Sequence, residues 1–238
     1  FGLNVVLGGA LAAGAAVLLV ERFDPTSALD AIVSHQVNVL AGAPTMWSAW
    51  ANTPGLDPDV FARVELATSG AARLDPEIAE TLRRRFGLEV TEGYGLTEAS
   101  PVVTAAFGLP WRPGSVGAPV EGVELRLVDE SGDDALVGDP GEIWVRGANV
   151  FKGYWNDAEA TRNAVDDDGW LHTGDKCHFR GPYLFFKGRI SEMIKTSGSN
   201  VAPREVELTL ETFPEIALAV VLGIPDERRG EAVGVVLV

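Results

Sequence analysis

The sequence is poor in cysteine and in basic residues, and each shortage excludes a class of protein. Cys177 is the one cysteine among 238 residues, so no disulfide can form within the chain, and a reducing, cytoplasmic compartment is the simplest expectation. Lys and Arg number 19 against 34 Asp and Glu, which gives a net charge of −15. We therefore do not expect nucleic acid as a partner, because phosphate backbones are bound by basic surfaces.

Apolar residues are plentiful instead. They make up 46% of the chain, against 22% charged residues, which predicts a globular protein with a buried core. The stretch Phe1 to Val20 has no charge, and its length would just span a bilayer. Its glycines favour a packed helix (1–13), a turn at Gly14 and a buried strand (15–20), so we expect no transmembrane segment. A chain that begins inside such a run is expected to be a fragment.

Between residues 20 and 90, helical and strand patterns alternate. The pattern predicts helices beginning at Pro25, Pro44 and Pro76 and strands over 37–41, 64–68 and 88–91. Alternation of this kind is typical of parallel strands with helices on the faces of the sheet. In such sheets ligands bind at the carboxyl ends of the strands. The loops at that edge, 69–73 and 92–98, are therefore candidate binding loops.

From about residue 100 the sequence pattern changes. Short expected strands (124–128 and 142–146) predict an antiparallel sheet or a small β-barrel-like subdomain. Beyond Arg189 we expect a turn at Ser197–Gly198, a helix from Pro203, and strands 217–223 and 232–238 joined by a polar loop, 225–231. The predicted class is α/β. The predicted domains are 1–190, divided into an α/β part (1–100) and a β-rich part (101–190), and 191–238, the beginning of a small α+β domain.

The segment Glu92–Gly93–Tyr94–Gly95–Leu96–Thr97–Glu98 carries the strongest chemical signal. Glycines let the backbone approach a ligand closely, and Tyr94 between them can stack on a flat ring. Thr97 can donate its hydroxyl to a phosphate oxygen, and Glu98 is a hard oxygen ligand suited to Mg²⁺. The alternative is a plain glycine turn with Thr97 capping a helix. Five residue types in a fixed order favour a nucleotide-phosphate site.

Two downstream segments add weaker signals. In the segment 169–175, Asp175 follows a glycine turn, and a carboxylate in that setting suits a ribose diol. In the segment 187–198, Arg189 and Lys195 flank an otherwise apolar stretch, for which a surface hairpin is the alternative. Cys177 is interpreted as a buried small side chain and not as a nucleophile.

In order and spacing, the three segments resemble the adenylate-forming (ANL) superfamily, which includes acyl-CoA synthetases, coumarate-type ligases, firefly luciferase and the adenylation domains of peptide synthetases. Within this superfamily, four further segments resemble the fatty acyl-CoA ligases. They are Arg22–Pro25, Gly42–Met46, Gly114–Gly117 and Gly147–Trp155. The resemblance implies an AMP-forming acid–thiol ligase that activates a carboxylic acid, expected to be a fatty acid, with ATP and Mg²⁺ and transfers it to coenzyme A. The alternatives are a nucleotide- or acyl-binding fragment without catalysis, and transfer to the phosphopantetheine of a carrier protein.

The resemblance also assigns roles to matching positions. Gly70 and Ala71 would lie against the adenine and the acyl-adenylate; Glu92, Gly93 and Gly95 would line the nucleotide site, with Tyr94 stacked on adenine. Thr97 would bind the α-phosphate and Glu98 would hold Mg²⁺. Asp175 would take the ribose hydroxyls, helped by Arg189. Lys195 would contact the adenylate, and Ser197 and Gly198 would shape the pantetheine tunnel. Thr97, Glu98 and Lys195 are the expected catalytic residues.

Two parts that the resemblance implies do not occur in these 238 residues: a phosphate-gripping loop with a lysine, and the lysine that drives adenylation. We therefore expect this polypeptide alone to form little acyl-AMP. Ser191 stands at the hinge position. The acyl pocket is expected between the helix 43–50 and the strands ending at 70 and 93, with Met46, Trp47 and Val102 as candidate walls. Trp47 and Trp50 as plain core residues are the alternative, and a homodimer stays open.

Overall fold

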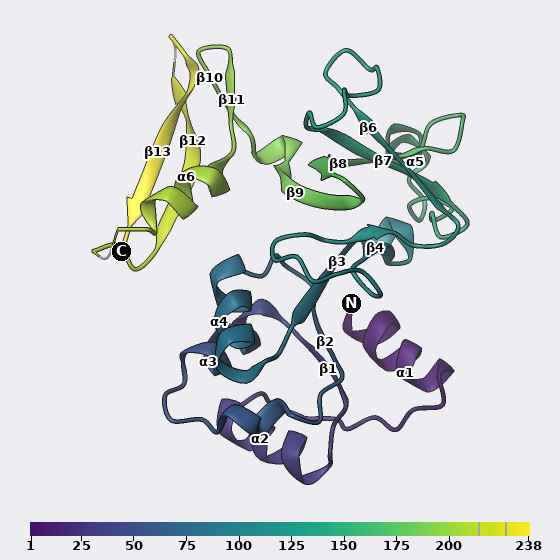
Figure 1. Cartoon of the computed structure of the whole chain (residues 1–238). Helices are drawn as coiled ribbons and strands as arrows, with labels where there is room; N and C mark the ends of the chain where they lie inside the picture. The colour runs from purple at the N-terminus through teal and green to yellow at the C-terminus, as the bar shows by residue number, and fades with distance from the viewer. Residues whose placement is uncertain (214, 227) are drawn as a thin grey trace. The chain divides into compact units, whose positions relative to one another are not determined.

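The computed structural model describes residues 1–213, 215–226 and 228–238 (Figure 1). The chain forms two compact units. The first comprises Phe1–Leu125, Val145–Leu171 and Arg180–Phe185, and the second comprises Arg126–Trp144, His172–Phe179 and Phe186–Val238.

A five-stranded sheet with the order β1-β2-β3-β4-β5 organises the first unit. Its strands are β1 (Val39–Gly42), β2 (Leu66–Ser69), β3 (Val90–Gly95), β4 (Val102–Ala105) and β5 (Ala118–Pro119). The first three run parallel, as the alternating pattern predicted, and the last two add antiparallel pairs. Ser69 and Glu92 are partners across β2 and β3, so the loops that follow these strands begin at the same edge of the sheet.

Three helices begin at the predicted prolines: α2 (Pro25–Ser34), α3 (Pro44–Asn52) and α4 (Pro76–Phe86). Each carries proline in its first turn, where its missing N–H costs nothing. The carboxylate of Asp24 accepts the Ser27 N–H and that of Asp75 accepts the Glu77 N–H, which satisfies donors that a helix leaves free. These local signals explain why the predicted starts are correct.

Aromatic side chains fill the core beneath these helices. Trp50 packs edge-to-face with Phe23, Trp47 and Phe61 at centroid distances of 5.4, 5.5 and 5.6 Å. The side chains of Trp47 and Trp50 are 0% exposed, and the Trp50 indole donates to the Pro25 carbonyl at 3.0 Å. The structure therefore favours the interpretation of both tryptophans as core residues.

The structure of the first twenty residues agrees in part with the prediction from the sequence. A π-helix, η1 (Gly2–Gly8), continues into α1 (Gly9–Ala12), and Gly14 turns the chain with a φ of +69°. The predicted strand over 15–20 is wrong: this stretch has no regular structure, and Leu19 is 78% exposed. An apolar run becomes a strand only where another strand accepts its backbone hydrogen bonds, and among the described strands β1 pairs with β2 alone. No helix in the described part of the chain has the length and apolar character needed to cross a membrane.

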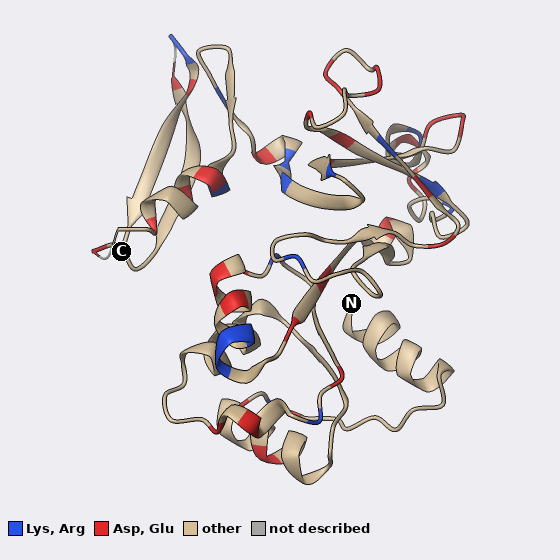
Figure 2. Cartoon of the chain, in the orientation of Figure 1, with Lys and Arg blue, Asp and Glu red and all other residues tan. Residues whose placement is uncertain are grey.

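The β-rich part holds a four-stranded sheet with the order β6-β7-β8-β9. Its strands are β6 (Val123–Val128), β7 (Gly141–Gly147), β8 (Leu171–Arg180) and β9 (Tyr183–Arg189), and α5 (Ala158–Ala164) lies between β7 and β8 in the chain. The sheet is open in the described strands, so of the two predicted forms the sheet is confirmed and a closed barrel is not formed. Acidic residues are frequent in the exposed loop between β6 and β7 (Figure 2).

The last part of the second unit is a sheet with the order β11-β10-β13-β12. Its elements are η4 (Ile190–Glu192), β10 (Ile194–Thr196), β11 (Ser199–Val201), α6 (Pro203–Leu210), β12 (Ala219–Asp226) and β13 (Gly230–Leu237). The predicted polar loop 225–231 is wrong at both ends, because Pro225 pairs with Glu231 and Asp226 with Gly230; position 227 lies outside the described residues. The Asp226 carboxylate accepts the N–H groups of Arg228 and Arg229, which closes the turn tightly.

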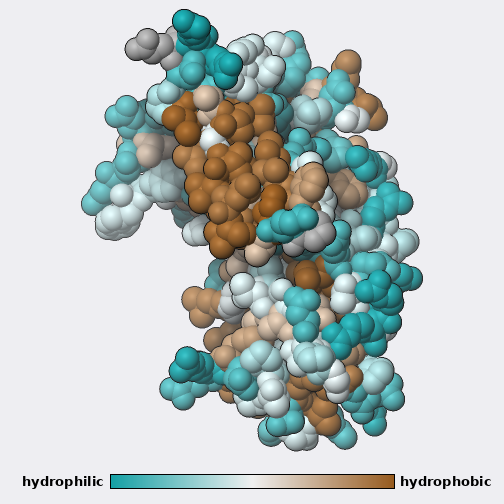
Figure 3. All heavy atoms as spheres, turned by 90° about the vertical axis from the view of Figure 1, so that its left-hand side faces the viewer, coloured by the Kyte–Doolittle hydropathy of each residue, from teal (hydrophilic) through white to brown (hydrophobic). Residues whose placement is uncertain are grey.

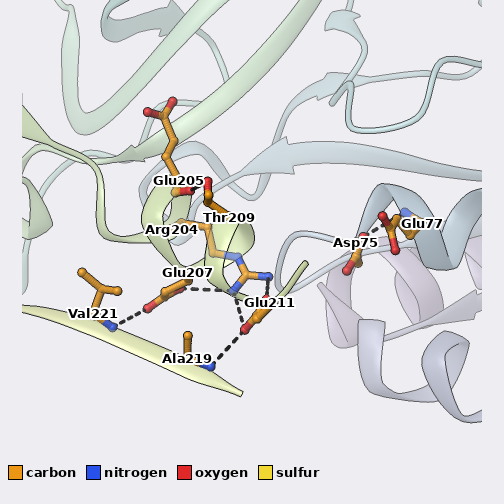
Figure 4. A network of polar contacts seen from close by, with 9 residues as sticks. All are labelled: Asp75, Glu77, Arg204, Glu205, Glu207, Thr209, Glu211, Ala219 and Val221. Atoms are coloured by element: carbon orange, nitrogen blue, oxygen red, sulfur yellow. Dashed lines mark hydrogen bonds and ion pairs between the residues drawn. The ribbon is translucent and has the colours of Figure 1, made fainter. Parts of the chain in front are cut away.

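Carboxylates hold α6 on β12. Glu207 accepts the Val221 N–H at 3.0 Å and Glu211 accepts the Ala219 N–H at 3.4 Å, while Arg204 pairs with both glutamates (Figure 4). The strands beside them carry an exposed apolar surface (Figure 3). Exposed apolar side chains that share one face of β12 and β13 are those of Val220, Leu222, Ile224 and Val236.

Candidate functional site

A buried carboxyl group on β3 holds the loop that follows β2. Glu92 is 7% exposed, and its Oε1 accepts the backbone N–H of Leu74 at 2.8 Å. Burial raises the pKa of Glu92 to about 7, against the opposing effects of the Leu74 N–H and of Arg73. Residues 92–95 of the predicted loop 92–98 belong to β3, and from this strand Glu92 holds the loop that follows β2 at Leu74.

The glycines of the segment are required for a reason that the sequence did not reveal. A Cβ on Gly93 would lie 2.8 Å from the Thr104 carbonyl oxygen, and one on Gly95 would lie 1.7 Å from the Pro101 carbonyl oxygen. Close approach to a ligand was the expected reason. That reason stays a prediction, and the structure adds another, which is the close passage of β4 and of the residues just before it.

Tyr94, between these glycines, is half-buried, and its backbone N–H donates to Thr104 Oγ1 at 3.3 Å. Thr97 begins a short 3-10 turn, η3 (Thr97–Ala99), and Leu96 before it makes no side-chain cap. The alternative in which Thr97 caps an α-helix is therefore not realised. The turn leaves Thr97 exposed and Glu98 half-buried beyond the end of β3.

A second segment, residues 149–154, binds this turn. Asn149 Nδ2 donates to the carbonyls of Ala99 and Val102 at 3.0 Å each, and the Phe151 N–H donates to the Glu98 carbonyl at 2.8 Å. The Tyr154 hydroxyl donates to Glu98 Oε1 at 2.8 Å, and this hydrogen bond raises the pKa of Tyr154. In the sequence, this stretch contributed only to the resemblance to fatty acyl-CoA ligases, and no role was predicted for its residues. Neutral side chains carry no catalytic signature, and their position beside Glu98 depends on a contact 56 residues away in the chain.

Glu98 is suited to an Mg²⁺ ion that a nucleotide brings. Tyr154 engages Oε1, and among the described residues no hydrogen bond or ion pair engages Oε2. Mg²⁺ keeps several waters and is commonly bound by one or two carboxylates together with substrate phosphates. Groups of three or more His, Cys, Asp or Glu that could hold a metal by themselves do not occur within the described ranges. The donor set therefore fits a nucleotide-borne cation and not an all-protein cage.

The space around Gly70 is occupied by an aromatic ring. A Cβ on Gly70 would lie 2.4 Å from Cε2 of Phe1, so the ring lies directly against this glycine. Ala71 follows with a φ of +72°, in the left-handed region. Of the predicted pocket walls, Met46 and Val102 are half-buried, whereas Trp47 is enclosed in the core against Gly42.

In the second unit, the predicted ribose residues are neighbours. Asp175 on β8 is 3% exposed, and its Oδ1 lies 3.3 Å from Nε of Arg189 at the end of β9. Thr173 Oγ1 accepts the Asp175 N–H at 3.1 Å, and Glu142 accepts the Gly174 N–H at 2.9 Å. Burial raises the pKa of Cys177 above its usual range, in agreement with its interpretation as a buried, unreactive thiol.

Lys195, Ser197 and Gly198 belong to the hairpin of β10 and β11. The Lys195 N–H donates to Glu231 Oε2 at 2.6 Å, and the Ser197 N–H donates to the Arg229 carbonyl at 2.9 Å. Ser197 and Gly198 turn the chain with φ angles of +51° and +82°. The predicted turn is confirmed, and its three candidate residues are exposed.

Comparisons with known proteins show the family and the fold of the chain. The model of the AMP-binding enzyme family matches residues 1–155. The 4-coumarate–CoA ligase 1 of Glycine max is 38% identical over 227 residues, which cover 92% of this chain and 78% of that protein. The 4-coumarate–CoA ligase 1 of Solanum tuberosum is 37% identical, with 97% of this chain and 44% of that protein covered.

A solved structure supports the fold. The crystal structure of ATP-bound MatB from Rhodopseudomonas palustris superposes with a TM-score of 0.93 at 33% identity and covers 99% of this chain. The chain spans 47% of MatB and 44% of the potato enzyme, which is about half the length of these relatives. A family match over most of the chain and a relative at this identity lead to one conclusion: the chain belongs to the AMP-binding enzyme family.

Proposed function

We propose that the complete product of this gene activates a carboxylic acid with ATP and transfers the acyl group to coenzyme A. The supporting observation is the site at the ends of β2 and β3. There Glu92 on β3 holds the loop after β2, and a turn hydrogen-bonded to Tyr154 presents Thr97 and Glu98. Family membership and relatives named as CoA ligases agree with this proposal.

In the first step a carboxylate oxygen of the substrate attacks the α-phosphorus of ATP, and pyrophosphate leaves. Thr97 donates its hydroxyl to the α-phosphate, where negative charge develops. Glu98 holds the Mg²⁺ that accompanies the nucleotide, and that ion neutralises phosphate charge when bound. Asp175 and Arg189 hold the ribose. In the second step the thiol of coenzyme A attacks the acyl carbonyl and AMP leaves, with Lys195, Ser197 and Gly198 serving the adenylate and the pantetheine arm.

The acid is the finer question. A fatty acid was the expectation from the sequence, and the comparisons do not support it. The relatives are named for 4-coumarate, an aromatic acid. The ring of Phe1 against Gly70 and the half-buried Met46 and Val102 supply apolar surface near the loops. We therefore place a planar aromatic acid first and a fatty acid second.

The test is acid-dependent ATP–pyrophosphate exchange by the complete gene product. 4-Coumarate and a medium-chain fatty acid are supplied separately, followed by chromatographic detection of the acyl product with coenzyme A or with a phosphopantetheinylated carrier protein. We expect exchange with 4-coumarate and product with coenzyme A. ATP binding without exchange for any acid would favour the non-catalytic alternative, and product on the carrier protein alone would favour the other acceptor.

A further inference from the structure

Among the described residues, the Tyr154 hydroxyl is the neutral side-chain group that hydrogen-bonds the carboxylate of Glu98, the expected metal ligand. The hydroxyl of Tyr154 lies 2.8 Å from Glu98 Oε1. Tyr154 is 42% exposed, so this hydroxyl could be hydrated by water instead of bonded to Glu98. Its position at the carboxylate therefore needs a structural cause.

That cause lies in the residues around Tyr154. Its backbone N–H donates to Thr161 Oγ1 at 2.9 Å, and Thr161 Oγ1 donates in turn to the Asp157 carbonyl at 2.7 Å, at the start of α5. The ring packs edge-on against Phe151 at a centroid distance of 4.9 Å. Backbone and ring are thus both held, and the hydroxyl is directed at Glu98 with little freedom left to lose.

The neighbouring bonds have a different effect. Asn149 and Phe151 bind carbonyl groups of the turn, so they fix its backbone and leave the Glu98 side chain free to rotate. Within the described residues, Tyr154 is the partner that the structure gives to the Glu98 carboxylate itself. A glutamate side chain has several rotatable bonds, and a hydrogen bond to one carboxylate oxygen restrains them. Because both oxygens are bonded to the same carbon atom, fixing the first also limits where the second can lie.

We propose that Tyr154 is a positioning residue: by donating to Oε1 it orients the Glu98 carboxylate so that Oε2 faces the cation that ATP brings. This inference rests on the proposed function, in which Glu98 holds that cation. It goes beyond that function by giving Tyr154 a role in the affinity for the metal ion, separate from the affinity for the nucleotide. A merely structural role for Tyr154 would weaken both affinities or neither.

The experiment compares Tyr154→Phe with Tyr183→Phe in the complete gene product. Tyr183 is a matched control, because its hydroxyl also donates one hydrogen bond, to the Pro110 carbonyl at 3.0 Å, in a contact that does not involve Glu98. Electron paramagnetic resonance measures free Mn²⁺ in titrations of the ATP complex, and calorimetry measures ATP binding in the presence of a chelator. Thermal melts check that both variants are folded.

We expect Tyr154→Phe to raise the dissociation constant for Mn²⁺ in the ATP complex roughly tenfold, because a hydrogen bond to a charged group is lost. Metal-free ATP binding should be unchanged in Tyr154→Phe, and both affinities should be unchanged in Tyr183→Phe. In a Glu98→Ala background, which removes the oriented carboxylate, Tyr154→Phe should add no further loss of Mn²⁺ affinity.

Three results would overturn the inference: wild-type Mn²⁺ affinity in Tyr154→Phe, equal loss of metal-free ATP binding, or a loss of Mn²⁺ affinity that persists in full in the Glu98→Ala background. The wild-type protein separates these results from a failure of the proposed function. If it binds neither ATP nor Mn²⁺ with ATP, the proposed function falls and takes the inference with it. If it binds both and Tyr154→Phe does too, only the role of Tyr154 is refuted.

Discussion

The carboxyl group of Glu92 accepts the backbone N–H of Leu74 at 2.8 Å, and this buried hydrogen bond joins β3 to the loop that follows β2. The pKa of Glu92 rises to about 7 from the ordinary 4.5, so the folded state binds the proton more tightly than the unfolded state does. Stability from this group is therefore greatest below pH 4.5 and decreases as the pH rises to about 7, by at most about 3 kcal/mol.

Glu92→Gln should remove most of this pH dependence, because an amide oxygen still accepts the Leu74 N–H and carries no titrating proton. Urea denaturation at about pH 5 and about pH 8 measures the free energy of unfolding, and the difference between wild type and variant isolates this carboxyl from the other acids. Glu121→Gln is the control, because Glu121 is exposed. Parallel pH dependence in the wild type and in Glu92→Gln would contradict the assignment.

Gly95→Ala should destabilise the first unit by about 3 kcal/mol, because the added Cβ would lie 1.7 Å from the Pro101 carbonyl oxygen and must push backbone apart. Gly9→Ala is the control: its Cβ would meet its nearest atom at 4.0 Å inside a helix, where alanine is preferred to glycine. Thermal unfolding of the two variants measures the difference. If both variants melt at the wild-type temperature, the close passage of the chain before β4 is refuted.

Glycines 93 and 95 also illustrate what the sequence could and could not predict. The sequence identified them as required, yet the cause, a neighbouring backbone, is a tertiary contact that no local pattern contains. The helices beginning at Pro25 and Pro76 were predictable because their caps lie within three residues of the start. The strand predicted over 15–20 failed because an apolar run says nothing about its pairing partner.

The same distinction separates the candidate residues. Asp175 and Arg189 lie on neighbouring strands, and the resemblance predicted that they work together. Tyr154 was not among the predicted site residues, because its interest comes from the position of its hydroxyl at Glu98 and not from its residue type. The structure shows where the Tyr154 hydroxyl lies, whereas Asp175 and Arg189 could be proposed from their residue types and from the resemblance.

Glu207→Ala should destabilise the second unit by about 1–3 kcal/mol, because the Val221 N–H, bonded to Glu207 at 3.0 Å, would lose its acceptor at the contact between α6 and β12 (Figure 4). Glu205→Ala changes the same residue type on the same helix but removes only an exposed ion pair with Lys187, expected to contribute about 0–1 kcal/mol. Hydrogen exchange at the Val221 amide measures the effect directly. Equal protection in both variants would show that the Glu207 carboxylate does not hold the strand.

Asp175 tests the ribose assignment most directly. If its carboxylate binds the ribose hydroxyls, the wild-type complete gene product should bind ATP at least roughly tenfold more tightly than 2′,3′-dideoxy-ATP, and Asp175→Asn should lose most of that preference. The comparison of two nucleotides within one protein cancels any general damage, which matters because Asp175 is 3% exposed and lies 3.3 Å from Arg189. A structural role alone would weaken the two nucleotides equally. A preference for ATP that survives in Asp175→Asn would assign the ribose contact to another residue.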